Sequence, residues 1–162
     1  MKKLLIALLG ISFGAALFAL PPPPPPPPHH PQVPPHVGPT TPHGGFDHFE
    51  AARNEARRLR RPMLVLFTGS DWCRYCMQLK SHILDSREFR HFARERLILV
   101  YIDVPRDVKL PRKLRHQNQA LLQQYGVSSY PTTVILSPHG RELGKIVGGP
   151  PDYIRRVMHY AK

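Results

Sequence analysis

The chain has 162 residues, room for one ordinary domain and a less structured segment beside it, which excludes an array of several domains. Lysine and arginine number 23 against 11 acidic residues, for a formal net charge of +12 at pH 7. Hydrophobic residues make up 41%, as in a globular protein, yet 13 of the 20 prolines lie between Pro21 and Pro42. The chain therefore divides into an N-terminal apolar stretch, a proline tract and a globular remainder.

The N-terminal segment has the layout of a secretory signal peptide. Met1-Lys2-Lys3 is a basic start, residues 4–18 are apolar without any charge, and Ala19 is a small residue at the cleavage position. We expect residues 1–19 to be the signal peptide. A retained membrane anchor is the alternative, although the run is short for about 30 Å of hydrocarbon. The absence of a following cysteine excludes a lipoprotein anchor, so we expect an exported, periplasmic protein, membrane-tethered only if the signal is kept.

Residues 20–45 are rich in proline, histidine and glycine and are interpreted as a linker. Eight consecutive prolines, Pro21 to Pro28, predict a polyproline II helix that acts as a semi-rigid spacer. The histidines at 29, 30, 36 and 43 could bind a metal weakly, but they lack a fixed geometry. No metal site is expected.

Residues 46–162 form the expected globular domain. Apolar residues recur at three- or four-residue spacing from Phe46 to Leu59, which predicts an amphipathic helix ending at Arg61-Pro62. The apolar run 63–67 predicts a strand buried on both faces. A turn over 69–72 then leads into a helix that starts at or beside Cys73.

The remaining elements complete one α/β domain. In chain order, we expect a helix resuming after Ser86, a buried strand over 97–102, a helix with Pro111 in its first turn and ending at Tyr125-Gly126, strands over 132–136 and 142–147, and a helix over 152–160. The order αβαβαββα predicts one mixed four-stranded sheet with helices on both faces, preceded by an additional N-terminal helix.

The positive charge belongs to this domain, since residues 20–45 contain no charged side chain apart from histidine. A basic domain could bind nucleic acid, but export argues against that partner. Arg57, Arg58, Arg60 and Arg61 have the spacing of the outward side of one helix end. We interpret them as a solvated face, and attraction to an anionic envelope surface is the second interpretation.

The two cysteines, Cys73 and Cys76, are the strongest functional signal. A structural disulfide across so short a loop would contribute only about 2 kcal/mol and would join no distant elements. A zinc site needs four ligands, and no second cysteine pair exists. At a helix start, however, backbone N–H groups stabilise a Cys73 thiolate, and Cys76 one turn later can resolve a mixed disulfide. The spacing therefore predicts a redox pair with Cys73 as nucleophile and Cys76 as resolving thiol.

Several segments together resemble the thioredoxin superfamily. They are Trp72-Cys73-Arg74-Tyr75-Cys76 with the strand before it, Tyr130-Pro131-Thr132, and Gly148-Gly149. Within that superfamily, residues 67–73 and 118–127 are similar to those of exported bacterial thioredoxin-like disulfide reductases. The resemblance implies a thioredoxin fold, a cis Pro131 packed against the disulfide, and backbone groups of Tyr130 that pair with an extended substrate strand. Trp72 is expected to shield the cysteine pair by packing.

One departure concerns the resolving step. Thioredoxins usually carry a buried aspartate six residues before the nucleophile, where this chain has Phe67, and the basic partner of that aspartate is replaced by Leu99. The usual proton acceptor for Cys76 is therefore absent. Asp71 or water must serve instead, although Asp71 can equally be a plain turn residue.

These observations predict a thiol–disulfide oxidoreductase of the cell envelope that reduces disulfides in exported proteins. It would need no cofactor but would take electrons from a membrane DsbD-type donor, since the envelope supplies none itself. We expect a monomer. Two alternatives stay open: an oxidase or isomerase of the same fold, and a non-catalytic binding module held at a surface by the proline arm. The presence of both cysteines disfavours the second.

Overall fold

The computed structural model describes residue 41 and residues 44–161. The predicted signal peptide, the proline run and the linker histidines lie outside the described residues. Among the helices of the described range, none has the length and apolar character of a membrane span.

The elements follow the predicted order, with a π-helical turn inserted after the second helix. They are α1 Phe49–Leu59, β1 Met63–Thr68, α2 Arg74–Leu79, the π-helix η1 Lys80–Leu84, α3 Arg87–Arg96, β2 Ile98–Asp103, α4 Arg112–Gln124, β3 Thr132–Leu136, β4 Glu142–Val147 and α5 Tyr153–Tyr160.

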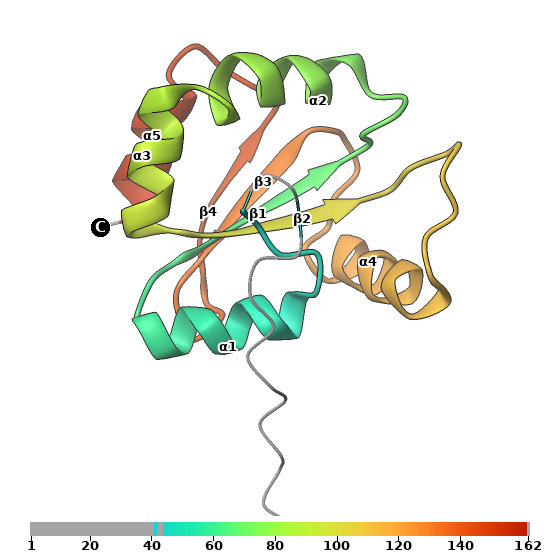
Figure 1. The fold of residues 1–162 in the computed structure, drawn as a ribbon, viewed down its shortest axis with the longest axis horizontal. Coiled ribbons are helices and arrows are strands. Elements are labelled where there is room, and N and C mark those ends of the chain that lie inside the picture. Colours follow the sequence, from blue (N-terminus) through green and yellow to red (C-terminus); the bar gives the residue numbers. More distant parts are fainter. Residues whose placement is uncertain (1–40, 42–43, 162) are drawn as a thin grey trace, which may run out of the picture. The chain divides into compact units, whose positions relative to one another are not determined.

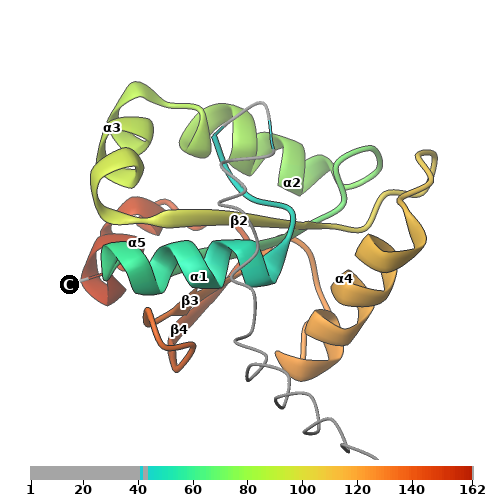
Figure 2. The ribbon, with the colours of Figure 1, turned by 60° about the horizontal axis from the view of Figure 1, so that its bottom comes forward.

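The four strands form one mixed sheet in the order β2-β1-β3-β4, which confirms the predicted fold class. Strand β1 pairs parallel with β2 and antiparallel with β3, and β3 and β4 are antiparallel neighbours. Helices α2, α3 and α5 cover one face, and α1 and α4 cover the other (Figure 1). A second view shows α2 and α3 on the opposite side of β2 from α1 (Figure 2). Each face of the sheet has its own hydrophobic core.

The central strand β1 is buried along its whole length, as predicted, because it has a strand on each side and helices on both faces. Its side chains alternate between the two cores: Met63, Val65 and Phe67 face α1 and α4, and Leu64 and Leu66 face the other helices. The end of this rigid strand supports the turn that carries the cysteines.

Strand β2 was predicted to be buried, but only alternate residues are. Ile98, Val100 and Ile102 belong to the core beneath α1 and α4, whereas Leu99 and Tyr101 are only partly buried on the other face. Leu99 and Tyr101 are only partly buried because β2 is an edge strand and one of its faces is incompletely covered.

The first helix begins at Phe49, three residues later than predicted. Phe46 instead forms a parallel bridge with Val100 at the edge of β2. Its N–H donates to the Leu99 carbonyl at 2.8 Å, and its carbonyl accepts from the Tyr101 N–H at 2.7 Å. Phe46 is therefore buried through strand pairing rather than through the helix, so its spacing from Phe49 was misleading. Pro111 also differs from expectation, since it caps α4 and precedes its first turn.

Candidate redox site

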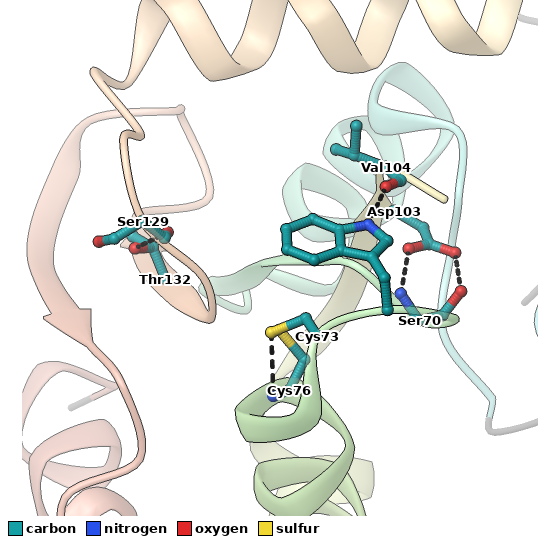
Figure 3. Close-up of a disulfide and its surroundings, with 8 residues drawn as sticks. Ser70, Cys73, Cys76, Asp103, Val104, Ser129 and Thr132 are labelled. Atoms are coloured by element: carbon teal, nitrogen blue, oxygen red, sulfur yellow. Dashed lines mark hydrogen bonds between the residues drawn. A yellow bond between two sulfur atoms is a disulfide. The ribbon is translucent and has the colours of Figure 1, made fainter. Parts of the chain in front are cut away.

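Cys73 and Cys76 are joined by a disulfide at the start of α2 (Figure 3). Cys73 is the N-cap residue, and its Sγ accepts the N–H of Cys76 at 3.2 Å. The Cys73 N–H donates to the Gly69 carbonyl at 2.9 Å, which closes the turn between β1 and α2. Cys73 is 5% exposed and Cys76 2% exposed. The arrangement places a reversible bond within one helical turn, where its opening disrupts no distant contact.

The turn before the disulfide is anchored to the end of β2 by Asp103 (Figure 3). The Asp103 carboxylate accepts the Ser70 N–H at 2.9 Å and the Ser70 hydroxyl at 2.5 Å. Asn118 of α4 donates to the Asp103 carbonyl at 2.8 Å. The sequence indicated only that Asp103 closes a strand, because nothing in the pattern links it to Ser70.

Trp72 lies between two loops beside the disulfide. Its indole N–H donates to the Val104 carbonyl at 2.8 Å, and its ring meets that of Tyr130 edge to face at 5.4 Å. The guanidinium carbon of Arg106 lies 4.1 Å from the centroid of the same ring. Gly69 passes directly under the indole, where a Cβ atom would collide with the ring. The only tryptophan of the chain is thus held by its neighbours on both sides.

Pro131 is buried and follows Tyr130 through a cis peptide bond. Its carbonyl accepts the Gly148 N–H at 2.8 Å, which ties this turn to the loop after β4. The Thr132 hydroxyl donates to the Ser129 carbonyl at 2.8 Å, and the close-up of the disulfide includes both residues (Figure 3). Burial raises the pKa of the Tyr130 phenol, so its hydroxyl stays neutral at physiological pH.

Asp71 holds the loop after β2, and within the described residues its carboxylate is hydrogen-bonded to that loop and not to the sulfur atoms. Its carboxylate accepts the backbone N–H of Arg106 at 3.0 Å and that of Asp107 at 2.7 Å. Desolvation alone would raise the pKa of Asp71, but hydrogen bonds from this loop hold the pKa below its ordinary value. The carboxylate is therefore ionised at neutral pH and joins the active-site turn to the loop.

Among the described residues, no buried carboxylate takes the place of the missing thioredoxin aspartate. The buried polar side chains of the described residues are Thr68, Asn118, Thr132 and Thr133. Phe67 is fully buried, with its ring centroid 6.0 Å from that of Tyr125. Cys76 instead lines a cavity of about 340 Å³, together with Thr68 and Asp103. The lining of this cavity is largely apolar, but the polar groups of Thr68 and Asp103 give it room for water next to the resolving sulfur.

Within residue 41 and residues 44–161, no three histidine, cysteine or acidic side chains gather as a metal site would require. The two cysteines are bonded to each other. The chemistry that this site can perform is thiol–disulfide exchange.

Comparison with known proteins gives the same picture. The model of the thioredoxin-like domain family matches residues 49–162 of the chain. The chain belongs to this family. It is 33% identical over 120 residues to disulfide bond reductase DsbH of Chlamydia pneumoniae, an alignment that covers 72% of each protein.

Solved structures agree with that assignment. A DsbH oxidoreductase superposes with a TM-score of 0.67 at 31% identity, covering 75% of this chain and 90% of the other. A thioredoxin from Thermus thermophilus, with a TM-score of 0.55 and 22% identity over 72% of this chain and 83% of its own, shares the fold. The resemblance to the thioredoxin superfamily and to DsbH-like disulfide reductases is confirmed, and this thioredoxin-like protein is a thiol–disulfide oxidoreductase.

Proposed function

We propose that this thioredoxin-like protein reduces disulfides in exported proteins, with Cys73 as the nucleophile and Cys76 as the resolving thiol. The observation that carries the proposal is the Cys73–Cys76 bond at the start of α2, with Cys73 at the N-cap position and Cys76 inside the helix. The reducing direction is supported by the name of the DsbH relative, a disulfide bond reductase.

The proposed cycle has two exchange steps. The Cys73 thiolate attacks one sulfur of a substrate disulfide, a mixed disulfide forms, and the other substrate sulfur leaves as a thiolate. Cys76 then loses its proton to water in the adjacent cavity and attacks Cys73 Sγ. This step releases the second substrate sulfur and regenerates the Cys73–Cys76 bond. A donor restores the dithiol with two electrons and two protons.

The supporting residues have proposed roles as well. Trp72 shields the sulfur atoms, Tyr130 presents backbone groups to an extended substrate segment, and Pro131 packs against the disulfide beside it. Proton transfer by Asp71 stays a prediction. Its carboxylate already accepts the backbone N–H groups of Arg106 and Asp107.

We also propose the cellular setting. Residues 1–19 direct export to the periplasm, residues 20–45 act as a spacer, and residues 46–162 carry the enzyme. A membrane DsbD-type protein supplies the electrons, the enzyme works as a monomer, and its positive charge attracts it to anionic envelope surfaces.

The reduction potential tests the direction of the reaction. The exposed Arg74 stabilises a Cys73 thiolate only weakly, and no histidine occupies the residues between the cysteines. We therefore expect a potential of roughly −210 to −270 mV, near that of thioredoxin and far from the −120 mV of DsbA. Equilibration of the mature protein with glutathione buffers, followed by thiol counting, measures it. A value close to that of DsbA would contradict a reductase and support the oxidase alternative.

A further inference from the structure

The loop between β2 and α4 places an arginine on the active-site tryptophan. The guanidinium carbon of Arg106 lies 4.1 Å from the centre of the Trp72 ring, and Trp72 is the residue before the nucleophile. Arg106 is exposed, and no carboxylate of the described residues forms an ion pair with it. A guanidinium that has no carboxylate partner among the described residues therefore lies at the edge of the redox site.

We propose that Arg106, stacked on Trp72, binds a carboxylate of the substrate, so that the enzyme prefers disulfides with an acidic residue beside the cysteine. The inference rests on the proposed reductase function and names the substrate class of the same site. A guanidinium stacked on an aromatic ring keeps its N–H donors in its own plane, where they can bind a carboxylate in a bidentate manner.

Three contacts hold the loop in register with the disulfide. The Asp71 carboxylate accepts the N–H of Arg106 itself, and the Trp72 indole donates to the Val104 carbonyl. Asp103, at the start of the same loop, binds Ser70. The Arg106 backbone is thus tied to the turn that carries Cys73. The arginine is positioned before substrate arrives, which lowers the entropy cost of binding.

The other charged groups around the site agree with this assignment. Arg74 and Lys109 are exposed and add positive charge from α2 and from the same loop. Of the acidic groups, Asp71 and Asp103 are occupied by backbone and serine donors. Asp152, in the loop before α5, pairs with Arg156 at 3.0 Å. Asp107 is the one carboxylate of loop 104–110, and it is exposed and has no side-chain partner among the described residues. A substrate carboxylate therefore meets a surface with basic groups in excess.

Three peptide disulfides test the proposal in turnover. They are identical except for the residue beside one cysteine, which is Glu, Gln or Lys. We expect wild-type kcat/KM to be about three- to five-fold higher for the Glu peptide than for the Gln peptide, and lower still for Lys. The Glu-to-Gln ratio should fall toward one in Arg106→Gln and stay partly raised in Arg106→Lys, which keeps the charge but loses the planar fork. Raising the salt concentration from about 0.05 M to about 0.5 M should shrink the wild-type ratio.

Arg141→Gln is the matched control. It makes the same charge change at an exposed arginine in the β3–β4 turn, just before Glu142. Glu142 pairs with Leu136, and Leu136 pairs with Met63 at the start of β1, the end of the sheet remote from the disulfide. This variant should keep the wild-type ratio. An unchanged Glu-to-Gln ratio in Arg106→Gln, or an equal loss in Arg141→Gln, would overturn the proposal.

Binding without chemistry separates this inference from the proposed function. Peptides with both cysteines replaced by serine can be titrated against wild type and followed by the fluorescence of Trp72, the only tryptophan. Tighter binding of the Glu peptide, lost in Arg106→Gln, would support the carboxylate site even if turnover of all peptides failed. Equal binding of the Glu and Lys peptides would overturn it. Failure to reduce the neutral Gln peptide would count against the proposed function alone.

Discussion

The two cysteines of the site have the same chemistry but different surroundings. Cys73 precedes the first turn of α2, and its sulfur accepts a backbone N–H, a contact that stabilises negative charge on a thiolate. Cys76 is inside the helix and lines the cavity under the turn. These surroundings are consistent with the proposed roles, in which Cys73 attacks and Cys76 resolves.

Trapping variants test this assignment. We expect Cys76→Ser to accumulate mixed disulfides through Cys73, because the resolving thiol is absent and the complex cannot be released. Cys73→Ser should accumulate few or none. Non-reducing electrophoresis and mass spectrometry of the mature protein incubated with oxidised substrate would count the adducts. Trapping mainly in Cys73→Ser would invert the two roles.

At the scale of elements, the site depends on contacts between loops that are far apart in the chain. Ser70 and Asp103 are 33 residues apart, and Asp71 and Asp107 are 36 apart. Together these carboxylates attach the turn after β1 to the loop after β2. Because β1 and β2 are parallel neighbours, both loops emerge at the same edge of the sheet.

The sign of the pH effect follows from the lowered pKa of Asp71. A carboxyl whose pKa is lower in the folded state stabilises the fold above its unfolded value, here 3.8, and loses that stabilisation as the pH falls through the folded value. We expect Asp71→Asn to lower the free energy of unfolding at pH 7 and to approach wild type at about pH 3. Urea unfolding at both pH values measures the difference.

The control for this variant is Asp107→Asn, which removes an exposed carboxylate from the same loop but keeps the backbone N–H that donates to Asp71. Its stability should change little at either pH.

The same pair of variants tests the predicted proton transfer by Asp71. If Asp71 accepts the Cys76 proton, mixed disulfides will persist longer in Asp71→Asn than in Asp107→Asn; equal lifetimes would exclude that role.

The strands and the cysteine pair could be predicted from the sequence because their signals are local. Residues 132–136, which follow Pro131 and are largely apolar, are the strand β3, and residues 142–147, which follow the turn at Pro138-His139-Gly140, are the strand β4. The roles of Asp103 and Arg106 could not be predicted in this way. Each depends on a partner across the sheet edge, and a polar loop has no periodicity that would indicate one. The prediction that Phe46 belongs to the first helix was wrong for a related reason. Its spacing from Phe49 fits a helix, but it gives no sign of the bridge that Phe46 forms with Val100.

At the scale of the whole domain, a cluster of seven arginines and the disulfide lie at opposite ends of the sheet. The turn that carries Cys73 follows the end of β1, whereas the last turns of α1 and α3 lead into the starts of β1 and β2 (Figure 1). The arginine end consists of Arg57, Arg58, Arg60, Arg61, Arg90, Arg94 and Arg96. Arg61 donates to the Arg94 carbonyl at 2.9 Å, so the two helices meet there. Among these arginines, only Arg58 has a carboxylate partner within the described residues, Glu55 at 2.6 Å.

This layout predicts that the arginine end binds anionic lipid surfaces while the disulfide faces away from them. Each basic side chain near such a surface contributes about 1 kcal/mol. We expect the double variant Arg60→Glu/Arg94→Glu to bind phosphatidylglycerol vesicles at least about 30-fold more weakly than wild type, from a loss of about 2 kcal/mol or more. Co-sedimentation with vesicles at about 0.1 M salt measures the binding.

The matched control is Arg112→Glu/Arg115→Glu, which changes the net charge equally at exposed positions in the first turns of α4. Helix α4 follows the loop that holds Trp72, so these residues lie toward the redox end of the sheet. A solvated face, the first interpretation of the arginines, predicts equal weakening in both double variants, because only net charge would matter. A docking face predicts a much larger loss of vesicle binding in Arg60→Glu/Arg94→Glu.

A docking face also predicts that wild type bound to vesicles reduces a soluble disulfide as fast as free enzyme, since Cys73 is at the opposite end from the lipid. Slower reduction on vesicles would place the membrane contact at the redox end instead.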